Sequence, residues 1–572
     1  PGLTSLDPVE LHEVLARLRD QGVQWVFLEA SSIGLEQGRL EGCRLVAAGI
    51  TNLSHEHLDV HGTMPAYASA KALLPACFGV QVVVAMERLR LAQDQSSQIL
   101  ARAVDASPKP IWVGTTESSQ APQRIVCEAI TQAGQHCRWR IGKTEVGFIL
   151  PTWGHHNLEN AGLIGGLLLE LGISLQEAVL VLSGLDLPQG RLEQVRSEDD
   201  QPRPMVLIDY AHTPDALSMV LSALRPVAQS RAGRLVVVFG CGGDRDRSKR
   251  PLMGRSAAEA ADLVILTADN SRSESTATII EDIRSGIAPD QQHRIRIQED
   301  RHEAIHMAIE SARAQDVVVL CGKGHEKTQL LGDQCLPFDE SLVAGAARRA
   351  WRAPWTLRDL LPILDRAGLS GARWLTPPTD PTQVVMGVSI DSRRCPAGSL
   401  FAAILGERFD GHDFLPEAAN QGAVAALVCR HGTDQPTDQS MGLPLLMVPD
   451  TIAALGALAA AWRADWPGRL VAVTGSNGKT TVKEMIASIM RAAVGRRSQW
   501  ATPGNLNNQI GLPLSLLGLR SRHRLAVMEI GMNHPGEVLS LALMAKPDLA
   551  VVTNAQREHQ EFMGTVQACA HE

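Results

Sequence analysis

The segment Val471-Ala-Val-Thr-Gly-Ser-Asn-Gly-Lys-Thr-Thr481 lies between a predicted strand and a predicted helix. The apolar residues 470–473 indicate a buried strand, and the following VKEMIASIMRAA has helical periodicity. Glycines in such a turn let backbone N–H groups close around phosphate oxygens, and the start of a helix adds a positive dipole. We therefore predict an ATP-binding phosphate loop that consists of Gly475, Ser476, Asn477, Gly478, Lys479, Thr480 and Thr481.

Two side chains of this loop have predicted roles in catalysis. Lys479 is expected to reach the β- and γ-phosphates, and the hydroxyl of Thr480 is expected to bind Mg²⁺. Only two residues separate the glycines, fewer than in the common G-x-x-x-x-G-K-[ST] loop. A glycine-rich turn that serves packing alone is the alternative interpretation.

The bulk composition excludes several classes of protein. The chain has 572 residues, of which 45% are hydrophobic and 20% charged, and its net charge is −8, so nothing indicates a nucleic-acid partner. Its ten cysteines are scattered without a C-x-x-C pair, which is typical of reduced thiols in a cytoplasmic enzyme. No apolar run is long enough for a membrane span. We expect several α/β domains.

Two stretches far apart in the chain repeat the same order of polar residues. A predicted buried strand at 24–29 ends at Glu29, and His57 follows in TNLSHEHLDVHG. A second predicted strand ends at Glu529, and His559 follows in TNAQREHQEFMG. Such repetition indicates one domain type used twice. We predict that each Glu–His pair holds Mg²⁺, directly or through water.

The repeat also predicts what lies outside the chain. Its register places a first phosphate loop upstream of Pro1, and the lysine that corresponds to Lys71 beyond Glu572. We therefore expect an excerpt of a longer polypeptide, and we expect residues 1–572 alone to be catalytically inactive.

The first 350 residues combine predicted strands with polar loops. Strands are expected at 24–29, 46–52 and 79–84, and again at 204–208, 234–239, 262–266 and 316–320. Parallel strands bind ligands at their carboxyl ends, so the loops after the last four strands predict a polar cleft. Arg245, Lys249, Arg272 and Lys323 offer positive charge there for a carboxylate-bearing substrate. Gln37 and Arg39 could contact an anionic substrate.

The second half begins after a predicted helix and linker around Pro354. A small α/β region over 386–466 carries the polar turns DSRR and GERFDGHDF. The phosphate-loop region follows, with the amide-rich TPGNLNN. Its Asn505 and Asn508 are expected to face a polar substrate near the γ-phosphate.

The ordered motifs resemble those of the Mur ligase superfamily, ATP-dependent amide-forming enzymes of bacterial cell-wall synthesis. LEASSIGLEQGR, DYAHTPDAL, GCGGDRDRSKRP, DNSR and GKGHE are similar to meso-diaminopimelate-adding ligases (MurE). TGSNGKTTVKEM, GNLNNQIGLP and EIGMNHPGE are similar to D-alanyl-D-alanine-adding ligases (MurF). The chain thus resembles part of a MurE–MurF fusion.

The resemblance implies a division into domains. It gives a partial central ATPase domain at 1–193, a Rossmann-like C-terminal domain at 194–350 and a linker at 351–356. It then gives a small α/β N-terminal domain at 357–466 and a partial P-loop central domain at 467–572.

The resemblance also implies roles for individual residues. UDP-MurNAc-peptide contacts fall on Thr4, Ser31, Gln37 and Arg39, and nucleotide contacts on Asn157, Arg191 and Asp209. The diaminopimelate pocket falls on Arg245, Asp269, Asn270, Ser271, Arg272, Gly322 and Glu326. Magnesium ligands fall on Glu29, His57, Thr480, Glu529 and His559, with Lys71 as a carbamate.

One residue departs from the pattern, because Ser271 replaces the proline of the usual Asp-Asn-Pro-Arg motif. Since Arg272 remains, meso-diaminopimelate is expected rather than lysine. The alternatives are a folylpolyglutamate-type ligase and a P-loop switch or scaffold without ligase activity.

Overall fold

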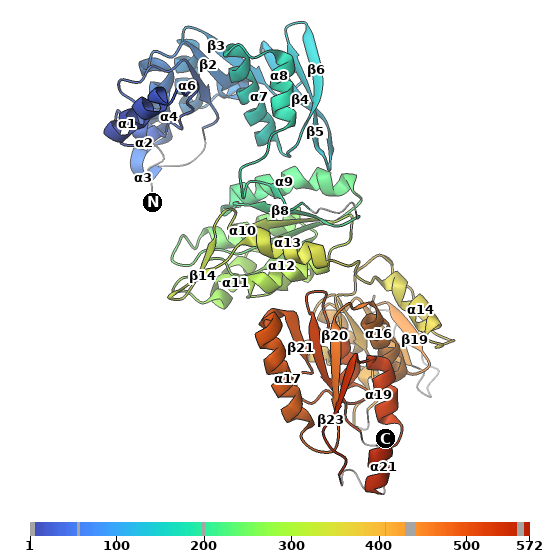
Figure 1. Cartoon of the computed structure of the whole chain (residues 1–572). Helices are drawn as coiled ribbons and strands as arrows, with labels where there is room; N and C mark the ends of the chain where they lie inside the picture. Colours follow the sequence, from blue (N-terminus) through green and yellow to red (C-terminus); the bar gives the residue numbers. More distant parts are fainter. Residues whose placement is uncertain are drawn as a thin grey trace. The chain divides into compact units, whose positions relative to one another are not determined.

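The computed structural model describes residues 6–53, 58–196, 201–406, 408–429, 442–532, 534–556 and 565–572, with the backbone alone at Asp59. Two compact units form, Pro1–Glu193 with Asp215–Gly233, and Gln194–Pro214 with Arg234–Glu572. In both units, helices alternate with strands along the chain, and most neighbouring strands pair in parallel (Figure 1). The predicted multidomain α/β architecture is therefore confirmed. Each helix in the described part of the chain is too short or too polar to cross a bilayer.

The first unit contains a six-stranded sheet in the order β1-β2-β3-β4-β5-β6. Strands β1 to β4 pair in parallel, and β4, β5 and β6 continue as an antiparallel meander. The strands are β1 Ala47–Ile50, β2 Val82–Met86, β3 Pro110–Gly114, β4 Gln123–Thr131, β5 Gly134–Ile141 and β6 Thr144–Leu150. The helices are α1 Pro8–Asp20, α2 Ser32–Glu36, α3 Leu58–His61, α4 Met64–Cys77, α5 Glu87–Leu91, α6 Gln95–Asp105, α7 His155–Glu170, α8 Leu175–Ser183 and most of α9 Pro214–Ser230.

Alternate residues of β2 enter two cores on opposite faces of this sheet. Val83 and Ala85 pack with Leu100 of α6, whereas Val84 and Met86 pack with Leu158 of α7. Side chains of a strand point alternately to its two faces, so an unbroken apolar run such as VVVAM is buried on both sides.

The predicted strand at 24–29 is wrong. This segment is irregular, and the side chains of Trp25 and Phe27 are 53% and 80% exposed. In the second copy of the repeat, the corresponding strand β22 lies between β20 and β21 and bonds to both. Among the described residues of the first unit, no strand corresponds to β20, so the segment 24–29 has no such strand to pair with. An apolar sequence without strand neighbours cannot satisfy its backbone groups as a strand.

The second unit begins with a sheet in the order β11-β10-β9-β12-β8-β7, and its four predicted strands agree with the structure. The pairs that join β8 to β12, β12 to β9, β9 to β10 and β10 to β11 are all parallel. The bounds are β7 Glu193–Gln194, β8 Met205–Asp209, β9 Leu235–Phe239, β10 Leu263–Leu266, β11 Ile295–Ile297 and β12 Val317–Cys321.

Four α-helices, one 3-10 helix and a hairpin surround this sheet in the described part of the chain. They are α10 Lys249–Ala260, α11 Thr276–Arg284, η1 Pro289–Arg294, α12 Arg301–Glu310 and α13 Glu340–Ala350, with the hairpin β13 Thr328–Leu331 and β14 Gln334–Pro337. Residues of α12 and α13 pack on one face of β8, β9 and β12. We call this sheet with α10 to α13 the β12 domain.

A five-stranded sheet follows, in the order β15-β19-β18-β17-β16, and only the β15–β19 pair is antiparallel. Its strands are β15 Arg373–Thr376, β16 Gly387–Ser389, β17 Ser399–Ala402, β18 Ala425–Cys429 and β19 Leu445–Val448. Its helices are α14 Leu357–Arg366, η2 Ser392–Arg394, η3 Gly411–Phe414, α15 Leu415–Asn420 and α16 Thr451–Asp465.

The last sheet is wholly parallel, in the order β21-β22-β20-β23. Its strands are β20 Arg469–Thr474, β21 Gln499–Ala501, β22 Leu525–Glu529 and β23 Leu549–Val552. Its helices are α17 Lys479–Val494, η5 Arg496–Ser498, α18 Gly511–Leu517, α19 Glu537–Ala545 and α21 Val566–His571. We call this the phosphate-loop domain. One hydrophobic core continues from α14 through α16 into it.

Candidate active site

The predicted phosphate loop connects β20 to α17, as the sequence indicated. Gly475 and Gly478 have φ angles of 124° and 84°, which side chains with a Cβ rarely adopt. A Cβ on Gly475 would also lie 2.3 Å from Thr553 Oγ1. Lys479 Nζ folds back over the loop and donates to the carbonyl oxygens of Gly475 at 2.6 Å and Ser476 at 3.1 Å.

The segment after β23 fixes the shape of this loop. Asn477 N donates to Asn554 Oδ1 at 3.0 Å, and Thr553 Oγ1 donates to the Asn477 carbonyl at 2.7 Å. Ser476 exchanges two hydrogen bonds with the backbone of Gln556. None of these residues had a predicted role, although Thr553-Asn554 recurs as Thr51-Asn52 in the first copy.

The carboxylate of Glu529 at the end of β22 faces the phosphate loop. Thr480 Oγ1 donates to Glu529 Oε2 at 3.0 Å, and Asn507 Nδ2 donates to Glu529 Oε1 at 2.9 Å. Glu529 is only 2% exposed. A hydroxyl and a carboxylate that converge beside a phosphate loop form an oxygen-rich donor set, which is what Mg²⁺ prefers.

The amide-rich loop is held by a buried lysine that the sequence analysis missed. Lys483 Nζ donates to the carbonyl oxygens of Thr502 at 3.1 Å and Gly504 at 3.2 Å. In sequence, Lys483 looks like an ordinary surface charge on α17. Of the two predicted substrate contacts, Asn505 is exposed, and Asn508 Oδ1 accepts from Gly511 N at the start of α18.

Several predicted residues of the first unit lie on the segment before α4. Ser31 caps α2 by accepting from Gly34 N at 3.1 Å, and Gln37 Oε1 accepts from Arg39 Nη2 at 2.6 Å. Glu29 is exposed, in contrast to the buried Glu529. The structure therefore does not give the two glutamates the same environment.

Among the other predicted site residues, Lys71 belongs to the described part of the chain. Lys71 lies in α4 with Nζ 5.0 Å from the centre of the Tyr67 ring. Thr4, His57 and His559 lie outside the described residues. Within the residues that are described, no three His, Cys, Asp or Glu side chains converge as a ready-made metal site.

The predicted nucleotide contacts are divided between the two units. Asn157 is in α7, where Nδ2 donates to Thr152 Oγ1 and to the Trp153 carbonyl, and Arg191 is exposed near the end of the same unit. Asp209 ends β8 in the second unit, where its Oδ1 accepts from Ala211 N at 2.8 Å.

The DNSR and GKGHE loops meet at the carboxyl ends of β10 and β12. Asn270 Nδ2 donates to Glu326 Oε2 at 2.9 Å, while Lys323 Nζ lies 3.1 Å from both Asn270 Oδ1 and Glu326 Oε2. Lys323 is fully buried. Burial alone would raise the pKa of Glu326, but the bonds from Asn270 and Lys323 lower it. Glu326 is therefore a carboxylate at neutral pH.

Two arginines lie beside Gly242 in the neighbouring loop. A Cβ at Gly242 would be 3.0 Å from Arg272 Nη1 and 3.6 Å from Arg245 Cγ. Arg272 has a left-handed φ of 49°, and its Nη1 donates to the Gly243 carbonyl at 2.8 Å. Because a guanidinium carries five N–H donors, Arg272 can hold its loop and still bind a carboxylate. Ser271 is 4% exposed, so its side chain contributes little to the surface.

A buried ion pair holds the residues that precede the DNSR and GKGHE loops. Arg301 Nη2 donates to Glu340 Oε1 at 2.6 Å, and neither side chain is exposed. Arg301 also donates to the carbonyl of Ala268 at 3.3 Å, just before DNSR, and to that of Cys321 at 2.8 Å, just before GKGHE. Sequence reasoning missed Arg301, because a charge at the first position of a helix is usually solvated.

A second buried arginine anchors the GCGGDRDRSKRP loop. Arg250 is fully buried and bonds to Glu274, Asp282 and the Gly242 carbonyl. The hydrogen bond from Arg250, followed by that from Asp244 N, lowers the pKa of Glu274 to about 2. Arg250 therefore ties the GCGGDRDRSKRP loop to Glu274 and to Asp282 of α11.

Comparison with known proteins places the chain in a family. It is 39% identical over 355 residues to the UDP-N-acetylmuramoyl-L-alanyl-D-glutamate–2,6-diaminopimelate ligase of Brucella melitensis, which covers 61% of this chain and 68% of that protein. The chain belongs to the Mur ligase family. It is accordingly an ATP-dependent ligase with the multidomain fold of that family.

Three Mur ligase family descriptions match separate parts of the chain. The Mur ligase middle domain matches twice, at residues 1–165 and 473–572. The glutamate ligase domain matches residues 190–324, and the description "Mur ligase family, catalytic domain" matches residues 384–463. The double match confirms that one domain type is used twice. The repeat is also visible locally, because Thr63 and Thr565 cap α4 and α21 in the same way.

Two solved structures of Mur ligases are similar to different parts of the chain. A 2,6-diaminopimelate-adding ligase is 36% identical and covers 60% of this chain and 68% of its own, with a TM-score of 0.48. MurF from Acinetobacter baumannii is 32% identical and covers 38% of this chain and 45% of its own, with a TM-score of 0.33.

Proposed function

We propose that the chain is part of a MurE–MurF fusion that catalyses two consecutive steps of peptidoglycan precursor synthesis. The first module, residues 1–350, would add meso-diaminopimelate to UDP-MurNAc-L-Ala-D-Glu. The second, residues 357–572, would add D-alanyl-D-alanine to the UDP-MurNAc-tripeptide. The domain boundaries at 193, 350 and 466 and the linker at 351–356 belong to this proposal.

The observation that carries the proposal is the junction of DNSR with GKGHE. Asn270, Lys323 and Glu326 bond to one another, and Arg272 lies beside them at the carboxyl edge of the sheet. Such a site offers a carboxylate for an ammonium group and guanidinium groups for carboxylates. The name of the Brucella protein, which includes 2,6-diaminopimelate, supports the same amine. The proposal for the second module rests on the TGSNGKTT, GNLNN and EIGMNHPGE motifs and on its two family matches.

The chemistry that these residues would serve is the joining of a carboxylate to an amine. ATP phosphorylates the carboxylate to an acyl phosphate, the amine attacks the carbonyl carbon, and the tetrahedral intermediate expels phosphate. Lys479 and the loop N–H groups would hold and orient the phosphates. In this family, Mg²⁺ would neutralise phosphate charge when bound. Thr480 and Glu529, with His559, would hold it in the second module; Glu29, His57 and the Lys71 carbamate would do so in the first.

Direct binding tests the amine assignment without depending on turnover. By titration calorimetry of residues 1–572, meso-diaminopimelate should bind about 10- to 100-fold more tightly than L-lysine, which lacks the second carboxylate. Arg272→Ala should abolish this preference, whereas Arg255→Ala, an exposed arginine on α10, should not change it. Equal binding of the two amino acids by the unmodified chain would refute the diaminopimelate assignment.

Phosphate release separates the ligase from its alternatives. In the complete MurE–MurF fusion that we propose, release should require both the UDP-MurNAc-peptide and the amino acid. Phosphate release that depends on neither substrate would favour a nucleotide switch. Release that depends on a folate and glutamate would favour the folylpolyglutamate-type ligase.

A further inference from the structure

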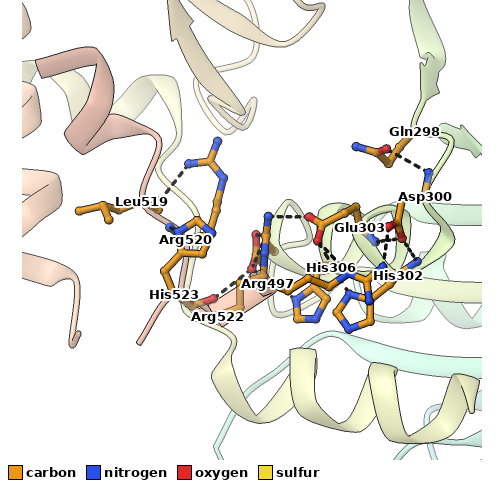
Figure 2. A network of polar contacts seen from close by, with 12 residues as sticks. Gln298, Asp300, His302, Glu303, His306, Arg497, Leu519, Arg520, Arg522 and His523 are labelled. Atoms are coloured by element: carbon orange, nitrogen blue, oxygen red, sulfur yellow. Dashed lines mark hydrogen bonds and ion pairs between the residues drawn. The ribbon is translucent and has the colours of Figure 1, made fainter. Parts of the chain in front are cut away.

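Helix α12 of the β12 domain carries an acidic face toward the phosphate-loop domain, although about two hundred residues separate them in sequence. Both belong to the second compact unit. Figure 2 shows Asp300 and Glu303 on one side and Arg497 and Arg522 on the other, with their side chains directed at one another. Arg497 lies in η5, and Arg522 lies in the loop between α18 and β22.

The contacts form a charge-matched network. Arg522 Nη2 donates to Glu303 Oε2 at 2.6 Å, and its Nη1 lies 3.3 and 3.2 Å from the two carboxylate oxygens of Glu310. Arg497 Nη2 donates to Asp300 Oδ2 at 2.6 Å. Ser521 Oγ adds a bond to Glu310 at 3.3 Å. Acidic groups lie only on the α12 side of these contacts and arginines only on the other.

The centre of the network is shielded from water. The side chains of Arg522 and Glu310 are 19% and 15% exposed. Burial alone would raise the pKa of Glu310, but His306 and Arg522 lower it, so the carboxylate stays charged. Removal of Arg522 from this partly buried network leaves Glu303 and Glu310 charged with one cationic partner fewer, which is unfavourable.

Additional contacts extend the same interface toward the five-stranded sheet. Arg313, which follows α12, donates from Nη1 to Thr382 Oγ1 at 3.0 Å. Arg296 Nη2, before α12, lies 3.4 Å from the position of a Cβ on Gly398. The α12 region therefore contacts the second module at several points rather than one.

The linker between the modules is anchored at both ends. Trp351 Nε1 donates to the Ala312 carbonyl at 2.9 Å, and Trp355 packs edge-on against Trp462 of α16. Only three residues lie between the two tryptophans. So short a connection gives the two surfaces a high effective concentration for each other.

We propose that the acidic face of α12, formed by Asp300, Glu303 and Glu310, is a docking surface for the Arg497 and Arg522 side of the phosphate-loop domain. It would hold the amine-binding domain of the first module and the ATP-binding domain of the second as one body. The partner is thus another part of the same chain. These contacts join the two domains whichever substrates they bind.

A cleavable linker tests this docking. A site for a specific protease is inserted between Ala353 and Pro354, and the folded chain is cut and passed over a gel-filtration column at low salt. The two pieces should co-elute, and the Arg522→Glu variant should release them at least about 10-fold faster. The matched control is Arg524→Glu, an exposed arginine of the same loop with the same change of charge. Pieces that separate at once without any substitution would overturn the proposal.

Hydrogen–deuterium exchange in the uncut chain provides a second readout, which does not require stable pieces. Arg522→Glu should accelerate exchange of the amides in 301–310 and 520–524 at least about 10-fold, and Arg524→Glu should not. The same increase for both variants, or for neither, would show that Arg522 does not hold an interface. If the molecular mass of the uncut chain in solution doubled as its concentration rose, the contact would form between two copies of the chain, and the proposal would also be overturned.

Discussion

Thr480 Oγ1 donates a hydrogen bond to Glu529 Oε2 at 3.0 Å, although 49 positions separate them in sequence. Thr480 lies in the first turn of α17 and Glu529 at the end of β22, so the sheet brings the phosphate loop and a buried carboxylate together. We expect Thr480→Val to weaken Mg²⁺-dependent ATP binding about 10- to 100-fold, because one oxygen donor is lost. Titration with a fluorescent ATP analogue, with and without Mg²⁺, measures this effect. Thr480→Ser keeps the hydroxyl and should bind nearly as the parent does; equal loss in both variants would contradict the assignment.

Lys483→Met should loosen the amide-rich loop. The substitution keeps most of the buried volume but leaves the carbonyl oxygens of Thr502 and Gly504 without the bonds from Nζ. We expect a loss of about 1–3 kcal/mol in unfolding free energy, measured by urea denaturation, and faster hydrogen exchange over 502–508. Unchanged exchange in that loop would show that Lys483 does not hold it.

Variants of the Arg301–Glu340 pair should affect the unfolding free energy and the binding of meso-diaminopimelate differently. Glu340→Gln removes one partner of a fully buried pair and should cost about 3–5 kcal/mol in unfolding free energy. In the double variant Arg301→Met/Glu340→Leu, stability should largely return, since apolar residues of similar size fill the space. Binding of meso-diaminopimelate should stay weak, because the bonds to the carbonyls of Ala268 and Cys321 are lost. Recovery of binding together with stability would contradict a positioning role.

His302 should make the stability of the α12 region depend on pH. Burial, then the neighbouring His306 and Arg497, lower the pKa of His302 to about 4; Asp300 partly opposes this shift, and Arg522 adds to it. The unfolded chain, with a histidine pKa of about 6.5, therefore binds more protons between these two values. Stability should fall as the pH falls from about 6.5 to about 4, by up to about 1.4 kcal/mol per pH unit for this one group.

The His302→Gln variant provides the comparison for this pH effect. Its unfolding free energy should depend less steeply on pH in the same range, as measured by urea denaturation at a series of pH values. An unchanged slope would mean that His302 is protonated to the same extent in the folded and unfolded states.

The sequence predicted those parts of the fold that local patterns determine. Four strands of the β12 domain, β8, β9, β10 and β12, are uninterrupted apolar runs followed by polar loops, and their predicted bounds agree with the structure within a residue or two. The segment around Trp25 and Phe27 has a similar pattern but forms no strand. Periodicity reports which side chains could be buried, whereas a strand also needs neighbours for its backbone.

The candidate site was predictable where chemistry follows glycine geometry, as at Gly475 and Gly478. The site was not predictable where a buried charged side chain holds a loop in place. Lys483, Arg301 and Arg250 read as surface charges in sequence, and only the tertiary packing shows that they are buried and hold loops. Each of them also bonds to at least one backbone carbonyl, and a carbonyl partner cannot be identified from residue types.

Asp300 and Arg301 are consecutive in sequence but make different contacts. Asp300 pairs with Arg497 of the phosphate-loop domain, whereas Arg301 donates to the backbone carbonyls just before the DNSR and GKGHE loops. A change of backbone at this single turn would disturb both at once. Natural variation in the proposed amine pocket and in the proposed docking surface should therefore be restricted together at the beginning of α12. Laboratory evolution that changes one of them there should also change the other.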